Sequence, residues 1–312
     1  MDTMFMLAIA LVIDLTLGEP PNPVHPVAWM GRLASFLEKA GISRSPSVQL
    51  VYGTLLTLLL VTLFAVPVVL ILPYLKSLSF PAYLVAGGII LKLAFSLKGL
   101  DRAAGRVRRL LLDGKLEAAR YELRALVSRD TQGLTEPQVV SATVESVAEN
   151  TSDSFVAPLL YFLLFGVPGA IAYRVVNTLD AVIGYHGKYE YLGKFASRLD
   201  DVLNFIPARL TALLFVLASY LSGRNARSAW QVARSQHART ESPNAGWVMA
   251  AVAGAIDGQL EKPGHYKLGN PGAPLTPRSI SDSQNLTNIA ALIWIMVCFI
   301  LGGISFAITS QA

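Results

Sequence analysis

The sequence has 312 residues, of which 53% are hydrophobic and only 15% charged, and its mean hydropathy is +0.48. This composition excludes an ordinary soluble protein and is typical of a membrane protein with several spans. The formal net charge is +5, but excess Lys and Arg in such a protein mainly report its orientation, so no nucleic-acid partner is expected.

Cysteine and histidine exclude two further classes. The single cysteine, Cys298, lies in an apolar run, so neither a disulfide framework nor a cysteine-based metal site is expected. The four histidines are scattered along the chain and form no HExxH pair, which excludes the common zinc enzymes.

The chain begins with an apolar helix over residues 3–17 that contains Asp14. A carboxylate near the end of a membrane helix usually faces the protein interior or a polar cavity, although an interfacial acid that reaches water is an equal alternative. His25 follows between two prolines, and proline biases its predecessor toward extended backbone, so this histidine is expected in a shaped loop. A structural role is the alternative to a functional one.

Several uncharged runs predict membrane spans. Residues 45–75 carry no charge, and residues 80–97 form a second span whose Lys92 is expected to reach toward the nearer surface. Further runs cover residues 154–173, 210–222 and 288–308. The predicted fold class is therefore an all-α, polytopic membrane bundle of about five or six spans, with broken or re-entrant helices and amphipathic cytoplasmic helices.

Two polar segments, 98–153 and 223–281, interrupt the apolar runs. Their excess of Lys and Arg, together with helical spacing of apolar residues, predicts amphipathic cytoplasmic helices. We expect one membrane-embedded domain over residues 1–312, in contact with lipid, with a loop over residues 262–277 where Gly and Pro are frequent.

Acidic and amide side chains gather directly before the run 154–173. On a helix, Glu145 and Glu149 share one face, and Asn150 and Asp153 follow within a turn. Such oxygen donors are those that Mg²⁺ prefers. The alternative is a solvated helix end whose acids cap the next segment.

A second polar group lies at Arg174, Asn177 and Asp180, which fall at i, i+3 and i+6 along an otherwise apolar helix. This stripe indicates a cavity wall. A buried network of hydrogen bonds that satisfies itself is the alternative.

A third polar group follows at residues 198–209. Asp200 and Asp201, with Asn204 one turn later, are suited to a divalent ion, while Arg198 or Arg209 is suited to bidentate phosphate contacts. Alternatively, Asp200 is an ordinary N-cap of the following helix.

Taken together and in order, these motifs resemble one family. They are DLTLGEP at residues 14–20 with HPV at 25–27, ESVAEN at 145–150, NTLD at 177–180, RLDDVLN at 198–204 with PAR at 207–209, and SPNAGW at 242–247. They resemble the membrane-bound CobD/CbiB proteins of cobalamin biosynthesis, the adenosylcobinamide-phosphate synthases. The resemblance runs from about residue 7 to about residue 270.

The resemblance implies a carboxylate–amine ligase that joins adenosylcobyric acid, a corrinoid, to aminopropanol phosphate or a related amino-alcohol. It implies ATP as cosubstrate, Mg²⁺ as cofactor, the bacterial cytoplasmic membrane as location, and other membrane enzymes of cobalamin assembly as partners. Because the sequence contains neither GxxxxGK[ST] nor a GxGxxG that leads from strand to helix, ATP binding would rely on carboxylate-bound metal and on arginines.

The resulting hypothesis assigns a role to each residue. Metal binding falls to Glu145, Glu149, Asp153, Asp200 and Asp201. Catalytic roles fall to His25 as the base and to Asn150, Asn177 and Asp180 as groups that orient the amine or carboxylate. Phosphate or substrate binding falls to Arg174, Arg198, Asn204, Arg209 and Asn244.

Two other functions and one question of topology stay open. Intramembrane Asp14, Arg174 and Asp180 also fit the ion path of a transporter or channel. The pair Asp200 and Asp201 also fits a membrane-embedded, Mg²⁺-dependent phosphotransferase or prenyltransferase. Finally, residues 154–183 either cross the membrane once or turn back near Gly166 as a re-entrant pair, which would place residues 185–198 on the cytoplasmic side.

Overall fold

The computed structural model describes residues 1–21, 23, 25–185, 187–272 and 274–311, and most of them are helical. In chain order the helices are α1 (Asp2–Thr16), α2 (Pro26–Gly41), α3 (Pro46–Leu78), α4 (Phe80–Lys92), α5 (Lys98–Leu112), α6 (Leu116–Leu123), α7 (Glu136–Thr151), the π-helical turn η1 (Ser152–Val156), α8 (Ala157–Ile183), α9 (Lys194–Leu221), α10 (Ala226–Gln236), the 3₁₀ turn η2 (His237–Arg239), α11 (Ala245–Ala255) and α12 (Pro277–Gln311). Strands β1 (Leu260–Lys262) and β2 (Tyr266–Leu268) pair antiparallel. The all-α class is confirmed.

Four helical stretches of the described chain are long and apolar enough to cross a membrane: Pro46–Leu78, Glu136–Ile183, Lys194–Leu221 and Pro277–Ile308. Five or six spans are expected from the sequence. The difference lies partly in α4, which has 13 residues and is therefore only about 20 Å long, shorter than the ~30 Å hydrocarbon core. Of the two spans predicted over residues 45–75 and 80–97, the first is thus a long helix and the second a short one.

The chain forms two compact units. Unit 1 contains Met1–Ser96, Ala157–Leu203 and Cys298–Ala312, and unit 2 contains Leu97–Val156 and Asn204–Val297. The polar segments expected at residues 98–153 and 223–281 both belong to unit 2. The apolar start of the chain and the whole of α8 belong to unit 1.

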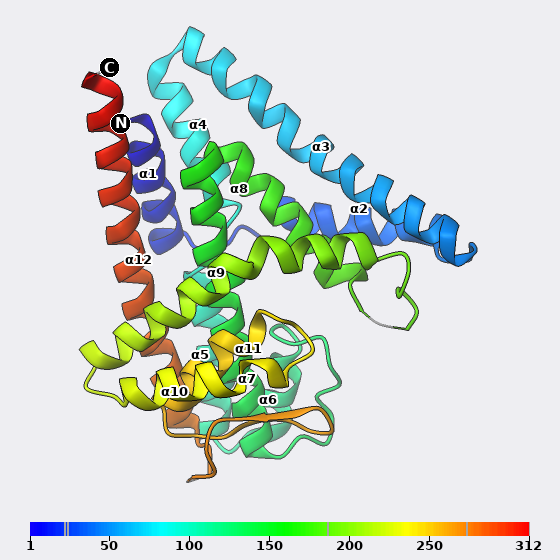
Figure 1. Cartoon of the computed structure of the whole chain (residues 1–312), viewed down its shortest axis with the longest axis vertical. Helices are drawn as coiled ribbons and strands as arrows, with labels where there is room; N and C mark the ends of the chain where they lie inside the picture. The colour runs from blue at the N-terminus through cyan, green and yellow to red at the C-terminus, as the bar shows by residue number, and fades with distance from the viewer. Residues whose placement is uncertain (22, 24, 186, 273, 312) are drawn as a thin grey trace. The chain divides into compact units, whose positions relative to one another are not determined.

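Close helix contacts in unit 1 depend on glycine. Helix α1 lies beside α4 (Figure 1), and a Cβ at Gly87 or Gly88 would come within 2.4 Å of Met6 or 2.6 Å of Ile9. The α3–α4 turn is stabilised by Ser79, whose hydroxyl accepts the Ala82 N–H. Helices α2 and α3 both pack on α8, so α8 is central to this unit.

Helix α8 is broken and turns back on itself. Gly166 has φ 68° and ψ −165°, outside the helical region, and Figure 1 shows the sharp bend. The rings of Tyr161 and Tyr173 stack with centroids 5.1 Å apart, whereas twelve residues of straight helix would separate them by about 18 Å. The helix therefore folds back at Gly166, as the re-entrant alternative predicts, while the side of the membrane on which residues 185–198 lie stays a prediction.

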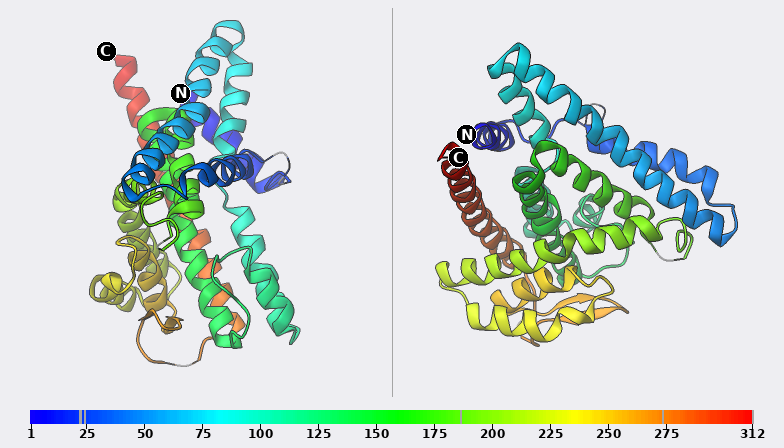
Figure 2. Two further views of the ribbon diagram at one scale, coloured as in Figure 1. Left: turned by 90° about the vertical axis from the view of Figure 1, so that its right-hand side faces the viewer. Right: turned by 45° about the horizontal axis from the view of Figure 1, so that its top comes forward.

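Unit 2 is built around α7. A capping box formed by Thr135 and Gln138 begins this helix, and eleven of its sixteen residues are buried. Helices α10 and α11 lie side by side (Figure 2), because a Cβ at Gly254 would come within 2.5 Å of the Ser228 carbonyl. Strand β1 packs on α7, so the expected loop at residues 262–277 in fact begins as a β-hairpin.

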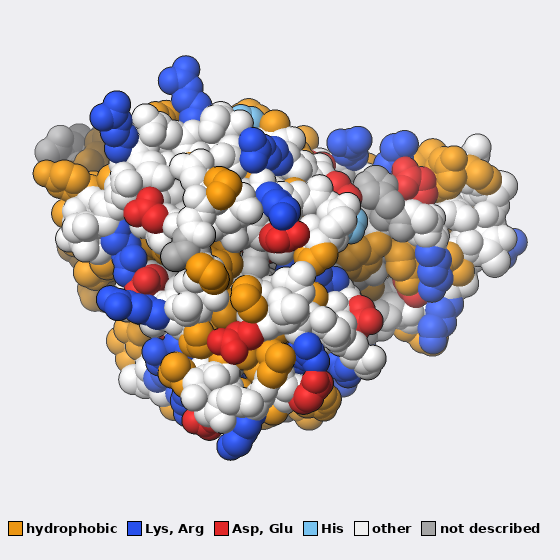
Figure 3. Space-filling view, turned by 90° about the horizontal axis from the view of Figure 1, so that it is seen from below, with side chains coloured by type: hydrophobic (Ala, Val, Ile, Leu, Met, Phe, Trp, Pro, Cys, Tyr) orange, Lys and Arg blue, Asp and Glu red, His pale blue; other side chains and the backbone are white. Residues whose placement is uncertain are grey.

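Charged side chains are scattered over the face of the molecule that Figure 3 shows. Figure 3 shows Lys and Arg intermixed there with Asp and Glu, with smaller groups of hydrophobic side chains between them. Because both signs are present, water or lipid headgroups can solvate this face.

Candidate functional site

The first polar group lies in unit 1, where the second half of α8 meets the beginning of α9. The Asn177 side-chain amide donates a hydrogen bond to Asp200 (3.3 Å) and accepts one from the Arg174 guanidinium (3.2 Å). Asp200 is buried, with 8% of its surface exposed. Two motifs that lie 23 residues apart in the sequence are thereby joined directly.

Two more carboxylates extend this group. Asp180 accepts a hydrogen bond from Ser197, and the Asp201 carboxylate lies close enough to Asp180 to repel it electrostatically. The Arg198 guanidinium is 3.6 Å from Asp201 and is largely exposed. We refer to Arg174, Asn177, Asp180, Arg198, Asp200 and Asp201 as the α8–α9 cluster.

The connection between α8 and α9 explains why the cluster forms. A Cβ at Gly193 would come within 1.7 Å of the Ile183 carbonyl oxygen, so only glycine lets the chain return this close to the end of α8. Helix α9 then begins at Lys194. Asp200 therefore lies inside a helix, and the alternative that it is an N-cap is wrong.

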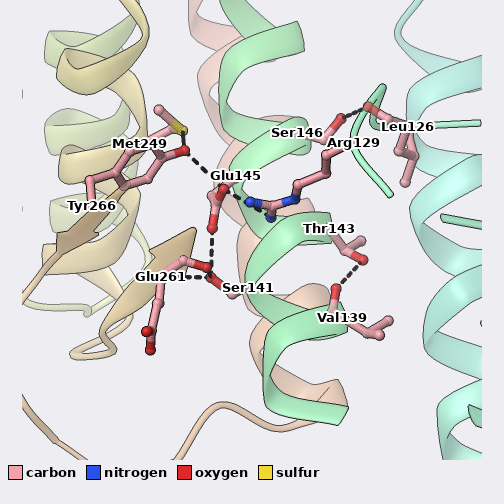
Figure 4. Close-up of polar contacts among 10 residues, drawn as sticks. All are labelled: Leu126, Arg129, Val139, Ser141, Thr143, Glu145, Ser146, Met249, Glu261 and Tyr266. Atoms are coloured by element: carbon pink, nitrogen blue, oxygen red, sulfur yellow. Dashed lines mark hydrogen bonds and ion pairs between the residues drawn. The ribbon is translucent and has the colours of Figure 1, made fainter. Parts of the chain in front are cut away.

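The second polar group lies in unit 2, around Glu145 on α7 (Figure 4). This carboxylate accepts hydrogen bonds from the Ser141 hydroxyl (2.6 Å), the Tyr266 hydroxyl (3.0 Å) and the Arg129 guanidinium (3.3 Å). The Glu261 N–H donates to Ser141 (2.7 Å). Glu145, which is 5% exposed, thus connects α7 to the β-hairpin and to the loop before α7.

A pocket of about 160 Å³ opens beside Glu145. Its walls are residues 126–129, one face of α7 and the β-hairpin, and its charged lining residues are Arg129, Glu145, Glu149 and Lys262. Burial, followed by the charge of Glu145, its hydrogen bond and the charge of Glu149, raises the pKa of Tyr266. Tyr266 therefore stays protonated and donates to Glu145.

Asn150 and Asp153 follow on the same chain segment. The Asn150 amide donates to the Ser146 carbonyl (3.0 Å) and accepts from Ser154 (3.1 Å), so its hydrogen bonds within the helix are already made. Asp153 is half-buried in the π-helical turn η1. Because η1 widens the helix, Asp153 does not continue the i, i+4 spacing of Glu145 and Glu149.

Arg209 and Asn244 meet in unit 2. The Arg209 guanidinium donates to the Asn244 side chain (3.1 Å) and stacks on the Phe205 ring at 3.5 Å. Trp247 lies next to it and stacks on His237, and burial followed by the charge of Arg209 lowers the pKa of His237. Asn204, the first residue of the second segment of unit 2, is buried. Phosphate or substrate binding by these residues stays a prediction.

His25 belongs to a buried ionic group in unit 1. Its Nδ1 accepts the Val27 N–H (3.2 Å), which makes it the N-cap of α2, and its Nε2 lies 2.6 Å from Glu19. Glu19 and Asp14 also bind Lys92, at 2.6 and 3.1 Å. Both His25 nitrogens are engaged, which favours the structural alternative over the role of a base.

The structure contradicts the expectation for Lys92 and confirms the expectation for Asp14. The expectation that Lys92 reaches a surface is wrong, because only 2% of it is exposed and two carboxylates hold it. The expectation that Asp14 faces the protein interior is confirmed, since it is 1% exposed.

The five predicted metal ligands lie in both units. Glu145, Glu149 and Asp153 are in unit 2, while Asp200 and Asp201 are in unit 1. Across the described ranges, no group of three or more His, Cys, Asp or Glu side chains is placed to hold a metal ion. Glu145 fits the role poorly because Arg129, Ser141 and Tyr266 already bind its oxygens.

Sequence reasoning missed Arg129 and Tyr266. Arg129 reads as one of many basic residues in a polar segment, and Tyr266 lies in a stretch read as loop. Their contacts with Glu145 span 16 and 121 residues, so no local pattern predicts them.

Comparison with known proteins gives a consistent result. The family model described as "CobD/Cbib protein" matches residues 7–307. The chain is 48% identical to "Cobalamin biosynthesis protein CobD" of Dehalococcoides mccartyi (strain CBDB1), over 98% of this chain and 99% of the relative. It is 40% identical to "Probable cobalamin biosynthesis protein CobD" of Methanothermobacter thermautotrophicus, over 94% and 96%.

A protein of the same name from Thermococcus kodakarensis is 41% identical, over 95% of this chain and 94% of its own length. No solved structure matches significantly. The chain belongs to the CobD/CbiB family of cobalamin biosynthesis proteins.

Proposed function

We propose that this protein forms an amide bond between a corrinoid carboxylate and an amino-alcohol. The substrates are adenosylcobyric acid and aminopropanol phosphate or a close relative, and the product is adenosylcobinamide phosphate. ATP is the cosubstrate. Family membership supports the pathway, and the polar groups of the chain support the chemistry.

One observation carries the proposal: the hydrogen bond from Asn177 to Asp200. It joins the polar stripe of α8 to the paired aspartates of α9. Carboxylates, an amide and a guanidinium group on otherwise apolar helices are costly to bury, and such groups in membrane segments usually mark functional sites. They also offer the donors and acceptors that phosphoryl transfer requires.

The reaction needs activation because a carboxylate does not accept an amine at neutral pH. A carboxylate oxygen attacks the γ-phosphorus of ATP, and ADP leaves. The amine nitrogen then attacks the acyl carbon, inorganic phosphate leaves, and the amine loses a proton. Arg174 and Arg198 are assigned to the phosphoryl oxygens, whose charge increases during transfer. Asn177 and Asp180 are assigned to orienting the corrinoid carboxylate.

Mg²⁺ would neutralise phosphoryl oxygens in this reaction. Magnesium in nucleotide-dependent enzymes is commonly held by one or two carboxylates, water and the substrate phosphates. The juxtaposed Asp180 and Asp201, with Asp200 next to them in sequence, fit that requirement. We therefore assign the ion to the α8–α9 cluster rather than to Glu145.

The location proposed for the protein is the bacterial cytoplasmic membrane, which it crosses more than once. The four candidate spans support this location. The basic polar segments 98–153 and 223–281 would face the cytoplasm, where ATP is available.

The direct test is incubation of the purified protein with adenosylcobyric acid, aminopropanol phosphate, ATP and Mg²⁺, with the product read by mass spectrometry. We expect adenosylcobinamide phosphate only when all four components are present. Formation of the product without ATP would contradict the ATP-dependent ligase mechanism. Transport of a substrate into proteoliposomes without chemical change would support a transporter instead.

A further inference from the structure

The pocket beside Glu145 contains an arginine whose hydrogen-bonding groups are incompletely used. The Nη2 atom of Arg129 binds Glu145, but Nε and Nη1 are buried and have no hydrogen-bond partner within the described part of the chain. An arginine N–H without water or protein acceptor is costly, on the order of 1–3 kcal/mol. The Arg129 side chain is 19% exposed and lines the pocket, so a ligand oxygen that enters there would reduce this cost once the guanidinium turns toward it.

Lys262 adds a second positive charge to the same pocket. The hairpin places it there, and its register pairs Lys262 with Tyr266. Glu145 is already neutralised by Arg129 and held by two hydroxyl donors. The cationic wall therefore exceeds what Glu145 balances, and it suits a phosphate monoester, which carries about −1.5 to −2 charges at pH 7.

A negatively charged side chain also lines the pocket. Glu149 lines the pocket one helical turn from Glu145, and its charge reaches the Tyr266 hydroxyl. A ligand with an ammonium group as well as a phosphate would place the ammonium against Glu149. The two charges of such a ligand would then each face an opposite charge on the wall.

The size of the pocket limits the ligand further. The pocket volume of about 160 Å³ lies below the ~300 Å³ at which pockets for drug-sized ligands begin. A phosphate ester of a two- or three-carbon amine is a small ligand that suits a pocket of this size.

We propose that this pocket binds a small phosphate monoester that also carries an ammonium group, through Arg129 and Lys262 on the phosphate and Glu149 on the ammonium. This deepens the proposed function and rests on it for the ligand's role, because it places the amino-alcohol phosphate in unit 2. Arg129, Lys262 and Glu149 thereby join the substrate-binding residues.

Isothermal titration of the purified full-length protein with phosphoethanolamine tests the binding directly, without turnover. We expect R129A and K262Q each to weaken binding at least tenfold, and E149Q to weaken phosphoethanolamine but not inorganic phosphate. The hydrogen bond given for Lys262 is accepted by its backbone carbonyl, from the His265 N–H, and a glutamine side chain leaves that bond in place, so K262Q stays informative even if R129A folds poorly. R124A is the matched control, because Arg124 is exposed and outside the pocket.

Three results would overturn the proposal: no binding to wild type, unchanged affinity in both R129A and K262Q, or equal affinity for phosphoethanolamine and inorganic phosphate. Turnover separates the two levels of inference. If wild-type protein binds phosphoethanolamine but forms no amide, the pocket proposal stands and the proposed function is wrong. If R129A and K262Q form the amide with an unchanged KM for the amino-alcohol phosphate, the pocket proposal is wrong and the proposed function stands.

Discussion

At the residue scale, Asp180 and Asp201 are the side chains on which the proposed reaction depends most. Their carboxylates repel each other, and a bound cation such as the proposed Mg²⁺ would offset this repulsion. We expect D180A and D201A each to lower the rate of amide formation by on the order of 10²–10³-fold, the usual cost of removing a group that supports transition-state charge.

The measurement is product per amount of membrane-inserted protein. Asp113 provides the control, because its side chain is 58% exposed and D113A should retain wild-type turnover. Wild-type turnover in both cluster variants would end the assignment of the metal and the reaction to the α8–α9 cluster.

Glu19 gives a prediction about pH. Burial raises its pKa, but hydrogen bonds from His25 and Lys92 outweigh that effect and lower the pKa from 4.5 to about 2. The unfolded chain therefore binds a proton more readily than the folded one. The resulting stability, about 3 kcal/mol at most, is complete above pH 4.5 and is lost as the pH falls toward 2.

Thermal denaturation in detergent between pH 3 and 7 measures this effect. E19Q should be less stable at pH 7 and should lose part of the dependence on pH. E117Q should behave like wild type, because Glu117 is 85% exposed. An acid dependence of equal size in E19Q and wild type would show that Glu19 is not its source.

The sequence predicts individual polar residues better than their partners. Helical spacing predicts the stripe Arg174, Asn177 and Asp180, and two of these side chains hydrogen-bond to each other. It does not predict that Asn177 meets Asp200, because that contact depends on how closely Gly193 lets the chain return to Ile183. Long-range contacts of this kind are absent from any local pattern.

At the scale of elements, the turn at Gly166 positions the second half of α8. Its backbone angles lie in a region that is essentially restricted to glycine, and other residues cost on the order of 1–3 kcal/mol there. G166A should therefore lower the melting temperature and the rate of amide formation together, because the α8–α9 cluster follows the turn.

Gly303 in α12 is the matched control. A Cβ there would meet nothing within 4 Å, and alanine in a helix is favoured over glycine by up to about 1 kcal/mol. G303A should leave the melting temperature unchanged or raise it. Equal melting temperatures for G166A and G303A would show that the turn does not need glycine.

The elements themselves are predicted unevenly. Long uncharged runs predict α3 and α12 well, since apolar length is a strong signal. The β-hairpin is missed because its strands have three residues each and lie in a stretch with frequent Gly and Pro. The fold-back of α8 is foreseen only as one of two alternatives, because a Gly-Val-Pro-Gly sequence permits a turn without requiring it.

At the scale of the whole molecule, the turn in α8 predicts the topology of residues 185–198. Because Gly166 reverses the direction of the helix, we expect the chain to return to the side from which it entered. With the segment 98–144 in the cytoplasm by its positive charge, position 191 should also be cytoplasmic.

Cysteine labelling tests this topology. The native Cys298 is buried, so C298S is the background, and Tyr191, which is 40% exposed, is replaced by cysteine. Y191C should react with a membrane-impermeant thiol reagent in inside-out vesicles but not in intact cells, as should the control D113C. Labelling of Y191C from the outside only would mean that residues 154–183 cross once.

The most direct measurement of the proposed chemistry follows one oxygen atom. Adenosylcobyric acid whose free carboxylate carries ¹⁸O at both oxygens is converted by the purified protein with ATP, Mg²⁺ and aminopropanol phosphate, and the released phosphate is analysed by mass spectrometry. Activation through an acyl phosphate predicts one ¹⁸O atom in inorganic phosphate for each amide formed, with ADP as the nucleotide product. Amide formation without ¹⁸O in inorganic phosphate, or with ¹⁸O in AMP, would contradict the mechanism.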